Sequence, residues 1–335
     1  MEYTRIPEND NEKEKRLDNI LLATRASWIV NWFLFGVKLY VVIFSRSKSV
    51  VAALVDSAVD LISQWVLSSA EMRLQIHEPS YPVGRTRLEA LGVLACASVM
   101  IMASIEVIQY SFTDIYNGFF NNEPQYIDGD FIMFVILAIG TIFKLILYFY
   151  CQMLNYNSDT LAALAEDHLN DVMSNATAIV TASLAIFYTK YWYIDQIGAI
   201  LISLVIIYRW IDVISDQVKK IVGHTATPEF IDEVTKLAHE HDSRIIVDIT
   251  RAYHFGKLYI VEIEIILPEL MTVRESHDIA LALQHKIEQN EMVERAFVHV
   301  DYAKRDGLEH KVERELVFIS ENKSNNKDDL IAQCF

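Results

Sequence analysis

Two pairs of aspartates lie within long apolar stretches of the chain, and both pairs have the same spacing. Asp56 and Asp60 are four residues apart, as are Asp167 and Asp171. In a helix, residues at i and i+4 stack on one face, so each pair presents two carboxylates side by side. An ionisable residue inside an apolar segment is costly and by default marks a functional path. Two matching pairs therefore predict a site where four carboxylates act together.

The chemistry of these side chains points to a metal ion. Carboxylate oxygens are hard ligands, so the four aspartates favour manganese or magnesium over metals that prefer thiolate or imidazole. His168 follows Asp167 directly, but a helical step of about 100° is expected to turn its ring away, and we do not count it as a ligand. Carboxylates about 4 Å apart repel by roughly 4 kcal/mol at an effective dielectric of about 20, so a metal-free site is expected to hold protons. Because metal ligands must be deprotonated, the pattern predicts exchange of a divalent cation for protons.

The aspartates must be held in an apolar surrounding, and the composition indicates that the chain has apolar helices that can do this. Of 335 residues, 52% are hydrophobic, although the formal net charge is −16. A helix of about 20 apolar residues spans a bilayer, and the stretches that reach this length are 22–45, 50–72, 88–112, 129–154, 158–187 and 192–214. We therefore predict an α-helical membrane protein with six transmembrane helices. The acidic balance argues against nucleic acid as a partner, because phosphate binding needs a basic surface.

Basic residues flank the predicted spans unevenly, and this predicts the orientation. The side that holds both termini carries Lys13, Lys15, Arg16, Arg25, Arg73, Arg85, Arg87, Lys219 and Lys220. The opposite side carries only Arg46, Lys48 and Lys190. Since cytoplasmic loops hold the excess of Lys and Arg, both termini are predicted to be cytoplasmic.

After Gly223 the pattern changes to that of a small soluble domain. Helices are expected at about 228–239 and 272–289, and strands at about 244–253, 258–267 and 295–302. The order αββαβ fits a two-layer α+β domain of ferredoxin-like type, with helices on one face of the sheet. The chain then has a cytoplasmic N-terminal segment, a six-helix transmembrane domain, a cytoplasmic C-terminal domain and a mobile tail, at residues 1–20, 21–216, 217–305 and 306–335.

Three other interpretations fit parts of the pattern. Lys38 and Lys144 also fall within predicted spans and would pair with the aspartates in a purely structural role, although two lysines cannot neutralise four acids. An intramembrane aspartyl protease needs one aspartate on each of two helices and a G-x-G-D run, which Ala165-Glu166-Asp167 does not match. A metal sensor that binds without transport stays open.

Several runs of the sequence resemble the cation diffusion facilitator family, over about residues 20 to 305. The matching positions are Asn31, Lys38, Asp56 to Leu61, Tyr81 to Glu89, Asp167 to Asn175, Leu267 to Glu269, Glu275 to Asp278 and Glu294 to Tyr302. Members of this family carry an acidic pair in the second span and a metal-binding pair in the fifth. The resemblance therefore implies the metal ligands Asp56, Asp60, Asp167 and Asp171.

The resemblance also implies a substrate. Zinc transporters of the family typically have H-x-x-x-D in the fifth span, whereas this chain has Asp167 first and so resembles the manganese branch. The implied protein is a divalent cation efflux transporter, not an enzyme, and a homodimer in the lipid bilayer. Mn²⁺ is the first choice of substrate, protons are the coupled ion, and no permanent cofactor is implied. Zinc and iron are the alternative metals, and an endomembrane such as the Golgi or vacuole is favoured over the plasma membrane.

Two further sets of residues follow from the resemblance. Arg87 falls where the family often has a basic residue at the base of the third span, able to pair with Asp212 or Asp216. Simple positive-inside anchoring explains this arginine equally well. The C-terminal domain offers residues that resemble accessory metal ligands of other branches, namely His277, His299 and Asp301. A plain surface or core role is the default for them.

Overall fold

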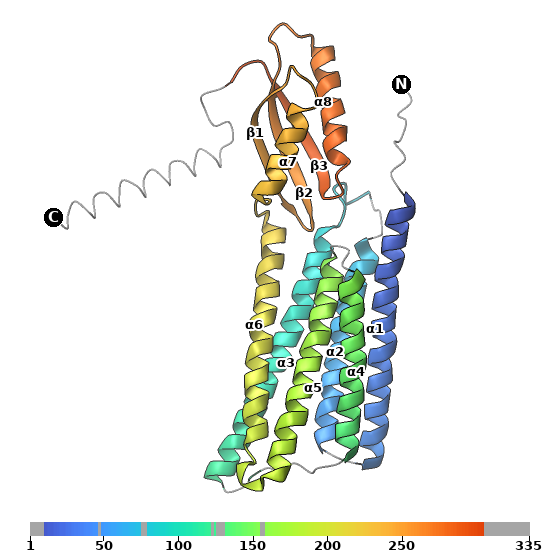
Figure 1. Cartoon of the computed structure of the whole chain (residues 1–335), viewed down its shortest axis with the longest axis vertical. Coiled ribbons are helices and arrows are strands. Elements are labelled where there is room, and N and C mark those ends of the chain that lie inside the picture. The colour runs from blue at the N-terminus through green and yellow to red at the C-terminus, as the bar shows by residue number, and fades with distance from the viewer. Residues whose placement is uncertain are drawn as a thin grey trace, which may run out of the picture. The chain divides into compact units, whose positions relative to one another are not determined.

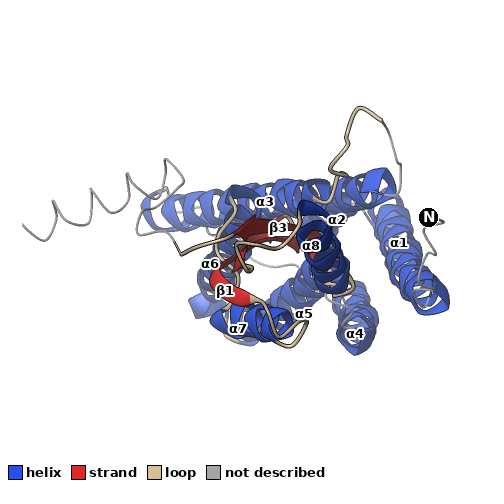
Figure 2. Cartoon of the chain, turned by 90° about the horizontal axis from the view of Figure 1, so that it is seen from above, coloured by secondary structure: helices blue, strands red, loops and turns tan. Residues whose placement is uncertain are grey.

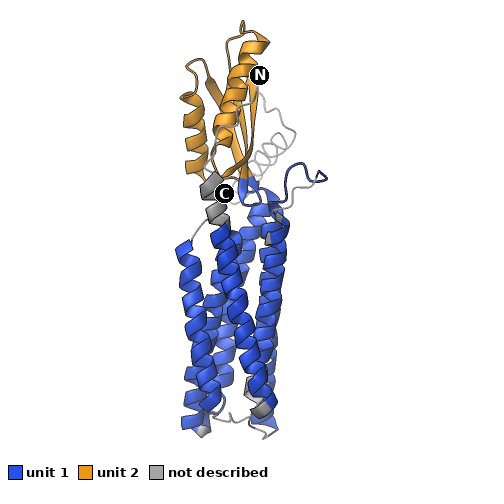
Figure 3. Ribbon diagram, turned by 90° about the vertical axis from the view of Figure 1, so that its right-hand side faces the viewer, with its two compact units in different colours: residues 1–224, 254–258 blue, residues 225–253, 259–335 orange. Residues whose placement is uncertain are grey.

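The computed structural model describes residues 10–45, 48–74, 79–121, 124, 131–154 and 158–304. The predicted tail and the first nine residues of the predicted N-terminal segment lie outside the described residues. The chain divides into two compact units (Figure 3). One unit comprises the residues up to His224 together with His254–Leu258, and the other comprises Thr225–Tyr253 together with the chain from Tyr259 onward.

Within the described residues, the first unit contains six long helices that lie side by side (Figure 1). They are α1 Asp10–Ser45, α2 Lys48–Leu74, α3 Arg87–Phe120, α4 Phe131–Leu154, α5 Asp159–Phe187 and α6 Ile194–Val222, with a short 3-10 helix, η1, at Thr189–Tyr191. Each predicted stretch overlaps one helix, and α1, α3 and α6 extend beyond their stretches by eight or more residues at one end. In this described part, α1, α3, α4 and α6 are long and apolar enough to cross a membrane. The other two, α2 and α5, carry the predicted aspartate pairs, and those charges lower their apolar character.

The central helix of this unit is α5. It contacts α1, α2, α3, α4 and α6, and Figure 2 shows these helices from above. On one side, Ala163 joins an apolar cluster with Val93 of α3 and Trp210 of α6. On the other side, α5 shares a second apolar cluster with Ala23 of α1 and Cys151 of α4. Because helices surround α5, its polar side chains are placed in the interior of the bundle.

Gly92 allows α3 and α2 to approach each other closely. A Cβ atom at this position would lie 2.5 Å from the Cβ of Ala70. Small residues at helix interfaces permit this kind of backbone approach in membrane proteins. The contact therefore depends on the absence of a side chain at Gly92.

We expect Gly92→Ala to lower the thermal unfolding temperature of the purified chain. Overpacking costs about 1–3 kcal/mol, which outweighs the roughly 1 kcal/mol by which alanine favours a helix over glycine. Gly36→Ala is the matched control, because a Cβ at Gly36 meets nothing within 4 Å. Thermal unfolding of both variants in detergent measures the difference, and equal unfolding temperatures would contradict the close contact with Ala70.

The second unit has the element order that the sequence predicts, αββαβ. The elements are α7 Pro228–His239, β1 Ile246–Phe255, β2 Leu258–Ile266, α8 Val273–Glu288 and β3 Val293–Asp301. The strands lie in the order β1-β2-β3, and β2 runs parallel to β3. A ferredoxin-like sheet has a fourth strand, whereas the described residues supply three, so the ferredoxin-like prediction is correct only for the order of these elements.

One face of the sheet is buried under the helices. Val261, Ile263 and Ile265 alternate along β2, and their side chains are fully buried. They belong to one apolar core with Val234 of α7 and Leu283 of α8. Side chains alternate between the faces of a strand, so both helices cover the same face, as predicted.

Candidate metal centre

Carboxylates from α2 and α5 converge on one lysine of α4. The Nζ atom of Lys144 donates a hydrogen bond to Oδ2 of Asp60 at 3.1 Å. The same Nζ atom forms an ion pair with Oδ2 of Asp171. Acids from two helices that the sequence separates by about a hundred residues therefore lie around one point inside the bundle.

The four predicted ligands differ in exposure. Asp167 is 2% exposed and Asp60 is 7% exposed. Asp171 is half-buried, and Asp56 is exposed at the surface of the single chain. Because Asp56 lies one helical turn from Asp60 on α2, it stands at the edge of the buried cluster.

The ring of His168 lies closer to the aspartates than the helical step between Asp167 and His168 predicts. Ligand atoms of Asp167, His168 and Asp171 all lie within 4.8 Å of one another, a spacing that could hold a metal ion. The ring is therefore not turned away from the aspartates, contrary to the expectation from a 100° step. The cause is that His168 and Asp171 are three residues apart, which makes them neighbours on the helix surface. Nε2 of His168 lies 3.1 Å from Oγ of Ser27.

Several polar atoms beside the cluster have no hydrogen-bond partner among the described residues. They are Oδ1 of Asp167, Nδ1 of His168 and both side-chain amide atoms of Asn170. A buried polar atom without a partner costs free energy, so these atoms are available to a ligand. Asn170 is not one of the four predicted ligands, although its position between His168 and Asp171 in an apolar stretch marks it as a polar residue at the same place.

The two lysines set the charge of the cluster. Lys38 donates from Nζ to Oγ of Ser57 at 2.6 Å, next to Asp56 in the sequence, while Lys144 contacts two carboxylates directly. With all six side chains ionised, the four aspartates and two lysines leave a formal charge of −2. A structural role for Lys144 accounts for Asp60 and Asp171, but it leaves Oδ1 of Asp167 without a partner. The residual charge matches one divalent cation.

Polar contacts fasten α5 to α3 and α6. The buried carboxylate of Glu89 accepts hydrogen bonds from Oγ of Ser158 at 3.1 Å and from the backbone nitrogen of Thr160 at 3.0 Å. These bonds satisfy groups at the start of α5 that the helix itself leaves open. Further along, Arg209 of α6 binds both carboxylate oxygens of Glu166. The residue that precedes the predicted ligand Asp167 is therefore held by a neighbouring helix.

A known protein family matches the part of the chain that contains this cluster. The model of the cation efflux transmembrane domain matches residues 24–222, which include all four aspartates and both lysines. The chain belongs to the cation efflux family. This confirms the resemblance that the sequence motifs indicated.

Relatives of this cation efflux protein include plant metal tolerance proteins. Metal tolerance protein 5 of Oryza sativa subsp. japonica is 35% identical over 306 residues, which cover 91% of this chain and 72% of the relative. Metal tolerance protein 10 of Arabidopsis thaliana is 36% identical, covering 90% and 70%. Metal tolerance protein 11 of the same plant is 34% identical, covering 91% and 77%. Cation efflux proteins are membrane transporters of divalent metal cations, so the chain is not an enzyme and the protease interpretation is wrong.

Arg87 does not form the predicted ion pair in this cation efflux protein. The guanidinium of Arg87 lies over the ring of Phe255, with 4.0 Å between its central carbon and the ring centroid. Asp216 forms an ion pair with Lys220 at 2.8 Å, and Lys220 also binds Asp159 at 2.7 Å. The structure thus does not pair Arg87 with Asp216 or Asp212. Arg87 packs on an aromatic ring, and Asp216 pairs with a lysine four residues along α6.

The accessory residues lie on two elements of the second unit. His277 is exposed on α8, and His299 is exposed on β3 beside the half-buried Asp301. In the described part of the chain, the metal-binding spacing of three or more such residues is found at Asp167, His168 and Asp171. His277, His299 and Asp301 do not form a comparable group there.

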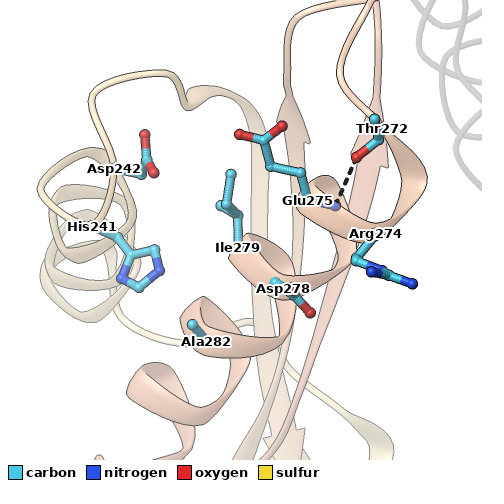
Figure 4. A pocket seen from close by; sticks show the side chains of 8 residues that line it. All are labelled: His241, Asp242, Thr272, Arg274, Glu275, Asp278, Ile279 and Ala282. Atoms are coloured by element: carbon cyan, nitrogen blue, oxygen red, sulfur yellow. Dashed lines mark hydrogen bonds between the residues drawn. The ribbon is translucent and has the colours of Figure 1, made fainter.

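The second unit also contains a pocket between α8 and the segment after α7 (Figure 4). Its volume is about 420 Å³, and it is lined by His241, Asp242, Thr272, Arg274, Glu275, Asp278, Ile279 and Ala282. Arg244 binds Asp242 and Glu275, each at 2.7 Å or less, and its hydrogen bonds hold the pKa of Asp242 well below the usual range. Asp242 and Glu275, two of the three carboxylates that line the pocket, are therefore paired with Arg244. By contrast, Oδ1 of Asp167 in the first unit has no hydrogen-bond partner among the described residues.

Proposed function

We propose that this chain exports a divalent cation, manganese by first choice, from the cytosol in exchange for protons. The proposal rests on one observation above the others. The buried Asp60 of α2 and the half-buried Asp171 of α5 meet at Lys144, while Oδ1 of Asp167 has no hydrogen-bond partner among the described residues. Asp56, Asp60, Asp167 and Asp171 are then the ligands, and their oxygens suit manganese.

All six helices of the first unit cross the bilayer in this proposal. The charges of α2 and α5 lower their apolar character, but Asp60 and Asp167 are buried inside the bundle. Intramembrane acids that face a bundle interior are compatible with spanning helices. Six spans place both termini on one side, and the distribution of basic residues makes that side the cytosol. The transmembrane domain then covers about residues 21–216 and the cytoplasmic domain about 217–305.

Protons are the coupled ion because the ligands must be deprotonated to bind a metal. A compartment that is acidic favours protonation of the aspartates and hence release of the metal on that side. The proposed location is therefore an endomembrane around an acidic compartment, such as the Golgi or vacuole, ahead of the plasma membrane. The names of the relatives, metal tolerance proteins, support removal of metal from the cytosol. We propose that the transporter acts as a homodimer.

Zinc is the second candidate, and His168 is the observation that favours it. A ring nitrogen of His168 lies within 4.8 Å of ligand atoms of Asp167 and Asp171. Imidazole suits zinc better than manganese. Against zinc, Nε2 of His168 is already engaged with Ser27 at 3.1 Å. Iron remains an alternative because oxygen ligands also accept Fe²⁺.

Flux into proteoliposomes tests the proposal. The purified chain is reconstituted, and uptake of Mn²⁺, Zn²⁺, Fe²⁺ and Co²⁺ is measured with and without an acidic interior. We expect the fastest uptake for Mn²⁺ and a clear acceleration by the acidic interior. Uptake that ignores the pH gradient would contradict proton exchange, and metal binding without any uptake would identify a sensor instead of a transporter.

A further inference from the structure

Lys144 occupies the place where the proposed ligands meet. Its side chain is 3% exposed, and it reaches from α4 to Asp60 of α2 and Asp171 of α5. Lysine is rarely buried to this degree unless it is paired. The ammonium group thus supplies one positive charge to these two carboxylates, half of the charge that a bound divalent ion would supply.

An ammonium group and a metal ion cannot use the same oxygens at the same time. The ammonium group contacts Oδ2 of Asp60 and Oδ2 of Asp171, which belong to two of the proposed ligands. Its positive charge would repel a metal ion bound by the same carboxylates, strongly so in a site withdrawn from water. The lysine side chain has a flexible four-carbon stem with a compact charge at its end. It is therefore able to move away from these carboxylates without a change in its helix.

We propose that Lys144 is a tethered counter-cation that competes with the transported metal for Asp60 and Asp171. It offsets one of the two negative charges of Asp60 and Asp171 in the metal-free protein, and it withdraws while remaining charged when the metal enters. This inference rests on the proposed function, because it assigns a regulatory part to the same site. Its consequence is a lower affinity for the metal, which allows the metal to leave the site.

The inference concerns Lys144 because its contacts with the proposed ligands are explicit. It has ion pairs with an acid of α2 and an acid of α5.

The test is metal affinity in the full-length chain. Mn²⁺ binding is measured at pH 8 by competition with a fluorescent chelator, for the wild type, Lys144→Met and Lys144→Arg. Methionine keeps the apolar stem without the charge, so we expect binding about tenfold tighter or more, since each such step corresponds to 1.4 kcal/mol. Arginine keeps the charge and is expected to leave binding close to wild type.

Lys220→Met is the control, because it removes a lysine that pairs with Asp159 and Asp216, away from the four aspartates. It is expected to leave Mn²⁺ affinity unchanged. Monodispersity and thermal unfolding establish that each variant is folded, and Lys144→Gln provides a second neutral variant if methionine prevents folding. Unchanged or weaker binding by a folded neutral variant overturns the inference.

Asp60→Asn separates this inference from the proposed function. If Asp60→Asn binds Mn²⁺ as tightly as the wild type, then the site itself is wrong. If Asp60→Asn binds weakly while folded Lys144→Met shows no gain, then the site stands and the counter-cation is wrong. Weak binding by Asp60→Asn together with tight binding by Lys144→Met supports both.

Discussion

Asp60→Asn is expected to abolish metal flux, with a loss of at least about 100-fold in the initial rate, since even changes beside a metal ligand cost 10–100-fold in affinity. Asparagine keeps the shape of the side chain but removes a charge and an anionic ligand. Asp60 is 7% exposed, so little water is available to replace the lost oxygen. The cluster would also fall from a formal charge of −2 to −1, too little to balance a divalent ion in an apolar surrounding.

The matched control is Asp195→Asn. Asp195 also lies on a helix of the same unit, and its Oδ1 accepts a hydrogen bond from Thr181 at 2.7 Å, but it is not one of the four aspartates. Asparagine preserves an oxygen acceptor for this bond, so flux should stay near the wild-type rate. Initial rates in proteoliposomes of equal protein content measure both variants. Wild-type flux by Asp60→Asn, or equal losses in both variants, would contradict the assigned ligand.

Asp167→His is expected to move the preference of the transporter toward zinc. Oδ1 of Asp167 has no hydrogen-bond partner among the described residues, and Asp167 shares a metal-binding spacing with His168 and Asp171. The substitution replaces a carboxylate with an imidazole, which suits zinc better than manganese. We expect the ratio of Zn²⁺ flux to Mn²⁺ flux to rise by about tenfold or more, equivalent to roughly 1.4 kcal/mol of discrimination.

Asp167→Glu distinguishes the chemistry of the ligand from a disturbance of packing. Glutamate also changes the side chain at a position that is 2% exposed, but it keeps carboxylate oxygens. The flux of Zn²⁺ and of Mn²⁺ through Asp167→Glu is expected to fall, without a gain in zinc preference. An unchanged ratio in Asp167→His would show that Asp167 does not select the metal.

The sequence predicted those features that depend on spacing along one element. The interval of four residues within each aspartate pair placed two acids on one helix face, and the structure brings Asp60 and Asp171 to the same lysine. The order αββαβ was predicted from the sequence of two helical and three β-rich runs after Gly223, and the structure has this order. The family followed from motifs spread over most of the chain, and the match to residues 24–222 confirms it.

Features that depend on how neighbouring helices are rotated were not predictable from spacing alone. Lys144 was visible within a span, but nothing in the sequence shows that its ammonium group lies between the acids of two other helices. Arg87 was paired with acids of α6 on the basis of family resemblance, whereas Phe255, distant in the sequence, takes that place. The approach of the His168 ring to Asp171 was predictable, because the three-residue interval between them is a local property, whereas the hydrogen bond of His168 to Ser27 depends on how α1 packs against α5.

The contact between Glu166 and Arg209 has a consequence for any rotation of α5. Glu166 and the proposed ligand Asp167 are consecutive residues, so their side chains point about 100° apart around the helix axis. In the proposed transport cycle, a rotation of α5 that reoriented Asp167 would also separate Glu166 from Arg209. The ion pair would then resist that rotation.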